Sequence, residues 1–166
     1  MCQCKCALSA VLSICLPRLL YCLPVWGNCN ETSARIVNNT LKKALRTITG
    51  DSTPNLDKAA YDAFGLLPFR SQLQLSNVRL VHRLLHSGTL CTQDNKFTLC
   101  VLNGRDTRSS TSYKLKLIKV RKSANKLCFP FGAAKHWNEL PFNVSSIVCF
   151  NRFHTAVANF ILNTLT

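Results

Sequence analysis

The sequence predicts a mainly α-helical protein, with a bundle-like N-terminal half, then a small β-hairpin or strand region, then C-terminal helices, so that any α+β character is minor. Three observations lead to this fold class. Apolar residues recur at helical spacing in the first half and near the end, glycine and proline separate these segments, and alternation with period two occurs only after residue 88. The length of 166 residues and the 47% hydrophobic composition fit one globular domain. Within it we distinguish a helical region, 1–88, from a C-terminal extension, 89–166.

Residues 7–21 are apolar nearly all round a helical wheel, which predicts an interior helix that Pro17 kinks or divides. Gly27 follows this segment and is able to take a left-handed cap. An alternative for residues 7–25 is a targeting or membrane segment. Because only ten mostly apolar residues, 7–16, precede the Pro17 break, that stretch is too short for a spanning helix, and no membrane partner is expected.

The clearest predicted helix runs from a cap at Asn30 or Thr32 to a stop at Gly50. Its predicted buried stripe comprises Ile36, Val37, Leu41, Ala44, Leu45 and Ile48. Basic residues lie off that stripe at Arg35, Lys42, Lys43 and Arg46. The wholly basic outer side is either an ordinary solvated face or a surface that follows nucleic-acid phosphates.

Two further helices are predicted before residue 88. The first begins at Pro54, after the cap Thr53, and closes at Gly65. The second starts at Pro68 and turns an apolar face inward with Leu73, Leu80, Val81, Leu84 and Leu85. It also places His82 and His86 four residues apart, as in some zinc sites. No third ligand accompanies them, so ordinary structural histidines are the expected interpretation.

Beyond Gly88 the pattern changes to short strands. Residues 97–102 are a strand candidate, Asn103-Gly104 is a turn signal, and residues 113–121 alternate, with a bulge near Ile118 that returns the basic residues to one face. A short helix over residues 133–138 and a last helix capped by Ser145 or Ser146 complete the chain. The last helix carries an apolar stripe of Ile147, Phe150, Phe153, Val157, Phe160 and Ile161.

The formal charge of +14, with only seven acidic residues, favours a polyanionic partner such as RNA or DNA. The acids are scattered, and the sequence contains no paired-aspartate word, phosphate-binding glycine loop or zinc box. We therefore expect no catalytic residues, metal, cofactor or small-molecule substrate.

Among the ten cysteines, those at Cys15, Cys22, Cys100 and Cys149 alternate with aliphatic residues, which predicts small core side chains and reduced thiols. Reduced thiols favour an intracellular protein, nuclear or cytoplasmic.

Basic residues concentrate between Arg105 and Lys126, where eight lysines and arginines accompany one acid, Asp106. The predicted nucleic-acid-binding residues are Arg105, Arg108, Ser109, Lys114, Lys116, Lys119, Arg121, Lys122 and Lys126, together with Lys42, Lys43 and Arg46. Three nearby aromatic residues, Tyr113, Phe129 and Phe131, either stack on bases or belong to the core. Trp137 is expected to be a packing anchor.

Several ordered words are distinctive when taken together. In the first half they are Leu16-Pro17-Arg18-Leu19-Leu20-Tyr21-Cys22, Val25-Trp26-Gly27, Arg46-x-Ile48-Thr49-Gly50 and Gly65-Leu66-Leu67-Pro68. In the second half they are Thr107-Arg108-Ser109-Ser110, Phe129-x-Phe131-x-Ala133-Ala134-x-x-Trp137-Asn138-x-Leu140-Pro141 and Phe150-x-x-Phe153. Over about residues 7 to 162, this order resembles the region after the catalytic palm in reverse transcriptases of non-LTR (LINE, jockey-like) retrotransposons. The chain departs from that pattern at Asp106, where an asparagine commonly stands.

The resemblance implies a thumb-like helical segment, 1–88, followed by a C-terminal extension, which together would help to hold RNA template and DNA primer. It also implies a polymerase palm upstream as a partner, since the catalytic aspartates of such RNA-directed DNA polymerases lie there. The expected function is thus that of a non-catalytic, nucleic-acid-binding fragment. Two alternatives remain: an inert or protein-interaction remnant, and a small membrane-associated or secreted protein that uses residues 7–25.

Overall fold

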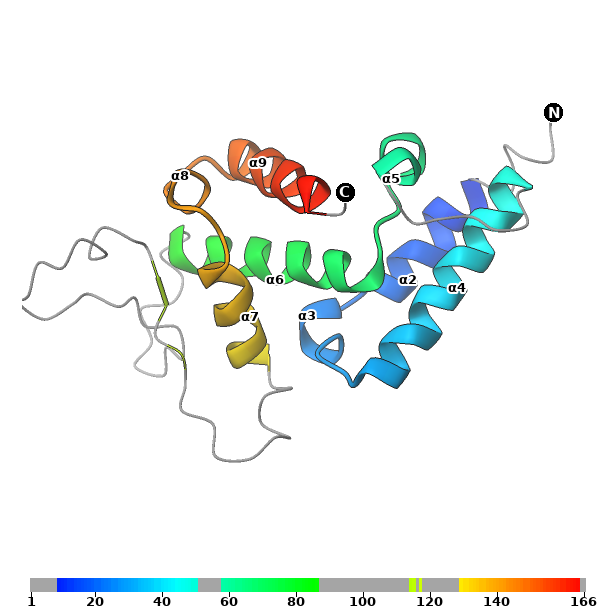
Figure 1. Cartoon of the computed structure of the whole chain (residues 1–166), viewed down its shortest axis with the longest axis horizontal. Coiled ribbons are helices and arrows are strands. Elements are labelled where there is room, and N and C mark those ends of the chain that lie inside the picture. Colours follow the sequence, from blue (N-terminus) through cyan, green and yellow to red (C-terminus); the bar gives the residue numbers. More distant parts are fainter. Residues whose placement is uncertain (1–8, 51–57, 87–113, 116, 118–128, 165–166) are drawn as a thin grey trace, which may run out of the picture. The chain divides into compact units, whose positions relative to one another are not determined.

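The computed structural model describes residues 9–50, 58–86, 114–115, 117 and 129–164, and it is mainly helical, which confirms the predicted fold class (Figure 1). In chain order the helices are η1 (Val11–Cys15), α2 (Leu16–Leu20), α3 (Leu23–Trp26), α4 (Glu31–Thr49), α5 (Lys58–Phe64), α6 (Phe69–His86), α7 (Phe129–Asn138), α8 (Phe142–Ser145) and α9 (Phe150–Asn163). The described residues contain no β-strand, and Leu115 alone forms an isolated bridge. The predicted strand 97–102 and most of 113–121 lie outside them and stay predictions.

The chain divides into two compact units. Unit 1 comprises Met1–Leu73 with Leu162–Thr166, and unit 2 comprises Gln74–Ile161, so the division falls inside α6. The boundary predicted at residue 88 lies outside the described residues, and it stays a prediction.

The N-terminal segment of unit 1 is not the interior helix that its composition predicts. It forms the π-helical turn η1 and then α2, with Pro17 in the first turn of α2. Val11 and Leu16 are buried, whereas Ile14 is 52% exposed and Cys15 is exposed. The prediction fails because the sequence shows which side chains of the segment are apolar. It does not show on how many sides of the helix other parts of the protein pack. No helix within the described ranges combines the length and apolarity that a membrane crossing needs.

Gly27 also differs from its predicted role as a left-handed cap. Its φ is −69°, a right-handed value, and the left-handed residue in this region is Cys22, with a φ of 50°. A Cβ atom at Gly27 would lie 2.5 Å from the Leu23 carbonyl oxygen and 2.7 Å from Leu73 Cδ1. Glycine therefore serves close packing at this position.

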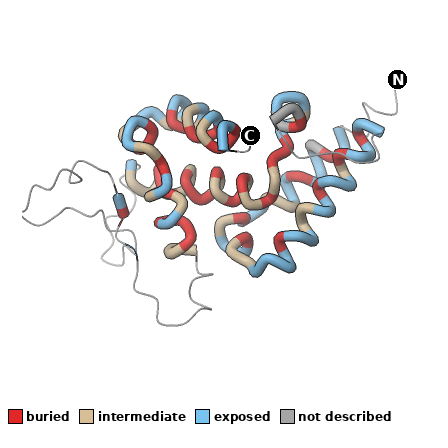
Figure 2. Tube along the Cα trace, in the orientation of Figure 1, coloured by how far each residue is buried: buried red, intermediate tan, exposed pale blue. Residues whose placement is uncertain are grey.

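Helix α4 begins and ends where local signals predict. The Asn30 side chain accepts a hydrogen bond from the Ser33 N–H at 2.9 Å, and Gly50 ends the helix with a φ of 79°. Its buried residues are Ala34, Leu41, Leu45 and Ile48, on one side of the helix (Figure 2). Ile36 is 63% exposed, so its assignment to the buried stripe is wrong. By helical geometry it points about 140° away from Leu41.

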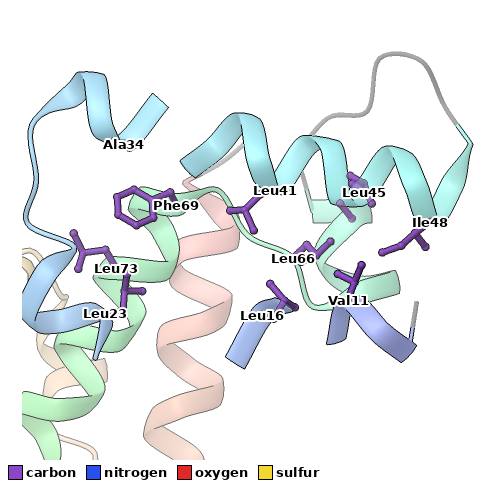
Figure 3. Packing of buried hydrophobic residues seen from close by; sticks show 11 residues of the cluster. Val11, Leu16, Leu23, Ala34, Leu41, Leu45, Ile48, Leu66, Phe69 and Leu73 are labelled. Atoms are coloured by element: carbon purple, nitrogen blue, oxygen red, sulfur yellow. The ribbon is translucent and has the colours of Figure 1, made fainter. Parts of the chain in front are cut away.

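The core of unit 1 forms between α4, the N-terminal helices and the start of α6. Figure 3 shows the side chains of Leu41, Leu45 and Ile48 turned toward the cluster that includes Leu16 and Leu66. Gly65, with a φ of 69°, ends α5 as predicted, and Pro68 precedes the first residue of α6.

Two polar contacts join α4 to the first turn of α6. The Phe69 N–H donates to Asn38 Oδ1 at 2.8 Å, which satisfies a backbone donor in the first turn of α6. Arg70 Nη2 lies 3.0 Å from Glu31 Oε2 in an exposed ion pair. Trp26 stacks on Phe69 with ring centroids 5.6 Å apart. The two polar contacts link α4 to the start of α6.

In unit 2, α6 packs against α7 and α9. Asn77 on α6 contacts His136 on α7 at 3.0 Å, and His82 on α6 stacks on Phe153 of α9. Helix α7 begins at Phe129, four residues before the predicted start. The prediction that Ser145 or Ser146 caps the last helix is wrong, because residues 142–145 form the separate helix α8. The α9 stripe is correct in part, since Phe153, Val157 and Ile161 are buried.

Candidate nucleic-acid interface

The structure describes four of the residues predicted to bind nucleic acid. Lys42, Lys43 and Arg46 lie on α4 in unit 1, Lys114 lies in unit 2, and all four are exposed. The others, Arg105, Arg108, Ser109, Lys116, Lys119, Arg121, Lys122 and Lys126, lie outside the described residues and stay predictions.

The basic residues of α4 lie along one exposed side of the helix, in what we call the α4 row: Arg35, Lys42, Lys43 and Arg46. At 100° per residue, Arg35, Lys42 and Arg46 lie within about 40° of one another, and Lys43 lies about 60° farther round. At a rise of 1.5 Å per residue, the row extends for about 16 Å from Arg35 to Arg46. Duplex DNA carries one charge per roughly 1.7 Å, so a stretch of that length presents about ten phosphate charges.

The position of the α4 row follows from the burial of the opposite side of the helix. Leu41, Leu45 and Ile48 are 3%, 2% and 5% exposed, and they hold that side against the core (Figure 3). The helix contains one acid, Glu31, at its N-terminal end, and this carboxylate is paired with Arg70 of α6. No other carboxylate on α4 offsets the positive charge of the α4 row.

Lys114 lies beside an anchored piece of backbone. The next residue, Leu115, is 2% exposed, and its N–H donates to Asn138 Oδ1 at 2.8 Å. Asn138 Nδ2 donates in return to the Leu115 carbonyl at 2.9 Å. The asparagine of the Trp137-Asn138-x-Leu140-Pro141 word thus holds the start of the predicted basic strand against α7.

The aromatic residues near the basic segment separate into two groups. Trp137 is 1% exposed and lies 5.7 Å from Phe153 between ring centroids, which confirms a packing anchor. Phe129 and Phe131 lie in α7 and are half-buried. Tyr113 lies outside the described residues.

His82 and His86 lie with ring centroids 4.3 Å apart, but the two rings have different environments. His82 is buried, and its Nε2 lies 2.8 Å from the Ile147 carbonyl oxygen, so this nitrogen donates in the neutral ring. Burial lowers the pKa of His82; the Ile147 hydrogen bond opposes this effect and the nearby His86 adds to it. Within the described part of the chain, no three histidine, cysteine or acidic side chains gather as metal ligands would.

The cysteines differ from the predicted small core residues. Cys15, Cys22 and Cys149 are free and exposed, and Cys29 is free and half-buried, while Cys100 lies outside the described residues. At Cys149 the backbone N–H groups of Arg152 and then Asn151 lower the thiol pKa, with the charge of Arg152 acting in the same direction. Alternation with aliphatic residues therefore does not indicate burial here.

Sequence reasoning did not single out Arg79 and Arg83 of α6. Their guanidinium carbons lie 5.6 and 4.6 Å from the ring centroid of Phe150 on α9. The available signal was the spacing of four residues, which places both arginines on one side of a helix. The ring that they contact follows only from the packing of α6 against α9.

Comparison of the chain with known protein families, curated proteins and solved structures found no match.

Proposed function

We propose that this chain binds the phosphate backbone of nucleic acid through the α4 row, as a non-catalytic part of a non-LTR retrotransposon reverse transcriptase. The observation that carries the proposal is the arrangement of Arg35, Lys42, Lys43 and Arg46, four exposed cations on a helix whose opposite side is buried. The family assignment rests on the ordered sequence words. The net charge of +14 supports the class of partner.

The chemistry of the α4 row suits backbone contacts rather than base recognition. Lys42 and Lys43 act as point charges, whereas the guanidinium groups of Arg35 and Arg46 can fork onto two phosphate oxygens. Neither kind of contact reads sequence. We therefore expect binding that depends strongly on salt and little on base composition.

The test compares two double variants that each remove one lysine and one arginine. Lys42→Gln/Arg46→Gln alters the α4 row, and Arg18→Gln/Lys135→Gln removes two exposed cations elsewhere. We expect the first to weaken binding of an RNA–DNA hybrid about tenfold or more at 50 mM salt. Its slope of log affinity against log salt should fall by about 1.8, since each phosphate contact contributes about 0.9. All four side chains are exposed, so both variants should retain the melting temperature.

Two outcomes would contradict the proposal. The first is absence of binding by the unmodified chain to RNA, DNA or hybrid at 50 mM salt. The second is an equal loss of affinity in the two double variants, because the α4 row would then contribute no more than any other surface charge. Gel shift or fluorescence anisotropy with at least two salt concentrations measures both.

A second candidate function is contact with another protein, such as the polymerase palm expected upstream. Unit 1 exposes large apolar side chains at Ile14, Tyr21, Val25 and Ile36, with Tyr21 75% and Val25 70% exposed. A palm segment of the parent element, co-expressed with the chain, should then co-purify with it. Tyr21→Ser/Val25→Ser should abolish co-purification while Lys42→Gln/Arg46→Gln preserves it.

A further inference from the structure

A separate basic and aromatic group lies in unit 2, where α6 packs against α9. Arg79 and Arg83 both place their guanidinium carbons over the ring of Phe150, at 5.6 and 4.6 Å from its centroid. Arg83 is exposed, and Arg79 and Phe150 are half-buried. We call these three residues the Arg–Phe cluster. None of its three members is among the residues that the sequence predicts to bind nucleic acid.

The ring at the base of the Arg–Phe cluster is supported from within unit 2. His82 lies 5.9 Å from Phe150 between ring centroids and stacks on Phe153 at 4.0 Å with an interplanar angle of 22°. His82 also contacts the Ile147 carbonyl at 2.8 Å, three residues before Phe150. Because His82 and Phe153 are both buried, the position of Phe150 is set by the core. A guanidinium that rests on this ring therefore has fewer conformations to lose on binding.

The surroundings of the Arg–Phe cluster are rich in positive charge. Arg152 is exposed two residues after Phe150, and the pKa of His154 is lowered by its burial and by the charge of Arg79. In the described part of unit 2 the only carboxylate belongs to Glu139, whose Oε2 lies 3.5 Å from Gln74 Nε2. The exposed charges of Arg83 and Arg152 suit an anionic ligand.

We infer that the Arg–Phe cluster is a contact for single-stranded nucleic acid, distinct from the α4 row. A guanidinium plane that rests on an aromatic ring offers an unpaired base a flat stacking surface, while its N–H edge donates to a neighbouring phosphate. Base faces are accessible in a single strand and covered in a duplex, so the cluster prefers single strands. The inference rests on the proposed nucleic-acid function and deepens it by naming the form of nucleic acid recognised.

The experiment uses the full chain with a labelled 20-nucleotide single strand and the same sequence as a duplex. Arg83→Lys keeps the charge and removes the planar group, so it separates stacking from simple attraction. We expect it to weaken single-strand binding about three- to tenfold and duplex binding less than twofold, in line with the strength of a base-stacking contact. Arg18→Lys, the same change at an exposed arginine of unit 1, should leave both affinities within twofold.

A second variant guards against an indirect effect at Arg83. Phe150→Leu keeps both arginines and removes the ring, and we expect it to weaken single-strand binding to a similar extent. The melting temperature of each variant shows whether the protein is folded, and binding is compared at a temperature where each variant is folded. A phosphorylated peptide of equal charge should bind Arg83→Lys and unmodified protein equally.

The outcomes distinguish this inference from the proposed function. If the unmodified chain binds nucleic acid and Arg83→Lys binds single strands equally well, the inference is wrong and the proposed function stands. An equal loss for single strand and duplex also overturns it, since the cluster would then contact phosphates alone. A loss of phosphopeptide binding in Arg83→Lys would overturn it in favour of a protein partner. If the unmodified chain binds neither strand form, both proposals fail.

Discussion

Asn138 contacts Leu115 with both halves of its side-chain amide, accepting from the Leu115 N–H at 2.8 Å and donating to the Leu115 carbonyl at 2.9 Å. The two residues are 23 positions apart, so this pair of hydrogen bonds joins two distant parts of the chain. Leu115 is buried and Lys114 is exposed. Asn138, which belongs to the Trp137-Asn138-x-Leu140-Pro141 motif, therefore holds the first part of the basic segment against α7 in unit 2.

Replacing Asn138 should destabilise the protein more than replacing an exposed asparagine. Asn138→Ala leaves the buried N–H and carbonyl of Leu115 without their partner, which costs roughly 1–3 kcal/mol for each unsatisfied group. Asn138→Asp retains the acceptor and loses the donor, so its cost should be intermediate. Urea denaturation measures the free energy of unfolding. The control is Asn143→Ala, at an exposed position of α8, and an equal loss there would contradict the assigned role of Asn138.

Stability should decrease as the pH falls below about 6.5. Burial lowers the pKa of His82 relative to its ordinary value of 6.5, and burial together with Arg79 lowers the pKa of His154. Each ring therefore binds a proton more readily in the unfolded chain, so acid favours unfolding. The loss approaches about 1.4 kcal/mol per pH unit for each histidine that is protonated only when unfolded. It begins near the unfolded pKa and levels off below the folded one.

Denaturant unfolding between pH 5 and 8 checks this expectation. Substitution of one histidine at a time shows how the dependence is divided. His82→Gln should flatten the curve and leave the contribution of His154. A curve that keeps its full slope in His82→Gln, or a protein that becomes more stable in acid, would contradict the assigned direction.

Two glycines should respond differently to larger residues. At Gly27 an added Cβ meets the Leu23 carbonyl oxygen at 2.5 Å, so Gly27→Ala should cost about 1–3 kcal/mol through overpacking. Gly50 has open space around it and a φ of 79°, so Gly50→Ala costs about 1–2 kcal/mol through backbone conformation alone. Asparagine tolerates left-handed backbone, so Gly50→Asn should recover much of that loss, whereas Gly27→Asn should be worse than alanine. Thermal unfolding of the four variants gives the comparison.

Cys149 should react with alkylating reagents before the other exposed cysteines that the structure describes. The backbone N–H groups of Arg152 and Asn151 lower its pKa, so more thiolate is present near neutral pH. Mass spectrometry after brief iodoacetamide treatment at pH 7 compares Cys149 with Cys15 and Cys22, which are also exposed. The preference should shrink at pH 9, where a lowered pKa adds little to the thiolate fraction of Cys149. Uniform labelling at pH 7 would show that the start of α9 does not activate this thiol.

Local sequence signals predicted where helices begin and end better than they predicted which side chains of the helices are buried. Asn30 caps α4 and Gly50 ends it because a side-chain acceptor and a left-handed residue act within one helical turn. Ile36 was wrongly assigned to the core, because it lies about 140° round the helix from Leu41, and an apolar residue is buried only if a neighbour covers its own side. The same reason applies to Cys15 and Cys22, which are apolar enough for a core and yet exposed.

The candidate nucleic-acid interface likewise has one part that the sequence predicted and one part that it did not. The basic side of α4 could be predicted, because the period of the helix and the burial of Leu41, Leu45 and Ile48 together leave Lys42 and Arg46 outside. The Arg–Phe cluster could not, since Phe150 lies 67 positions after Arg83 and no period relates them. Its existence depends on the packing of α6 against α9 through His82 and Phe153.

By itself, the sequence determined the helical class, the ends of α4 and the side of that helix that carries charge. These properties depend on residues within a few turns of one another, where backbone geometry relates spacing in the chain directly to position in space. Tertiary structure alone decided which apolar side chains are covered, why Gly27 cannot be larger, and which ring Arg79 and Arg83 contact. Those outcomes depend on residues distant in the chain that come together only when the helices pack, because burial is a property of the neighbours and not of the residue.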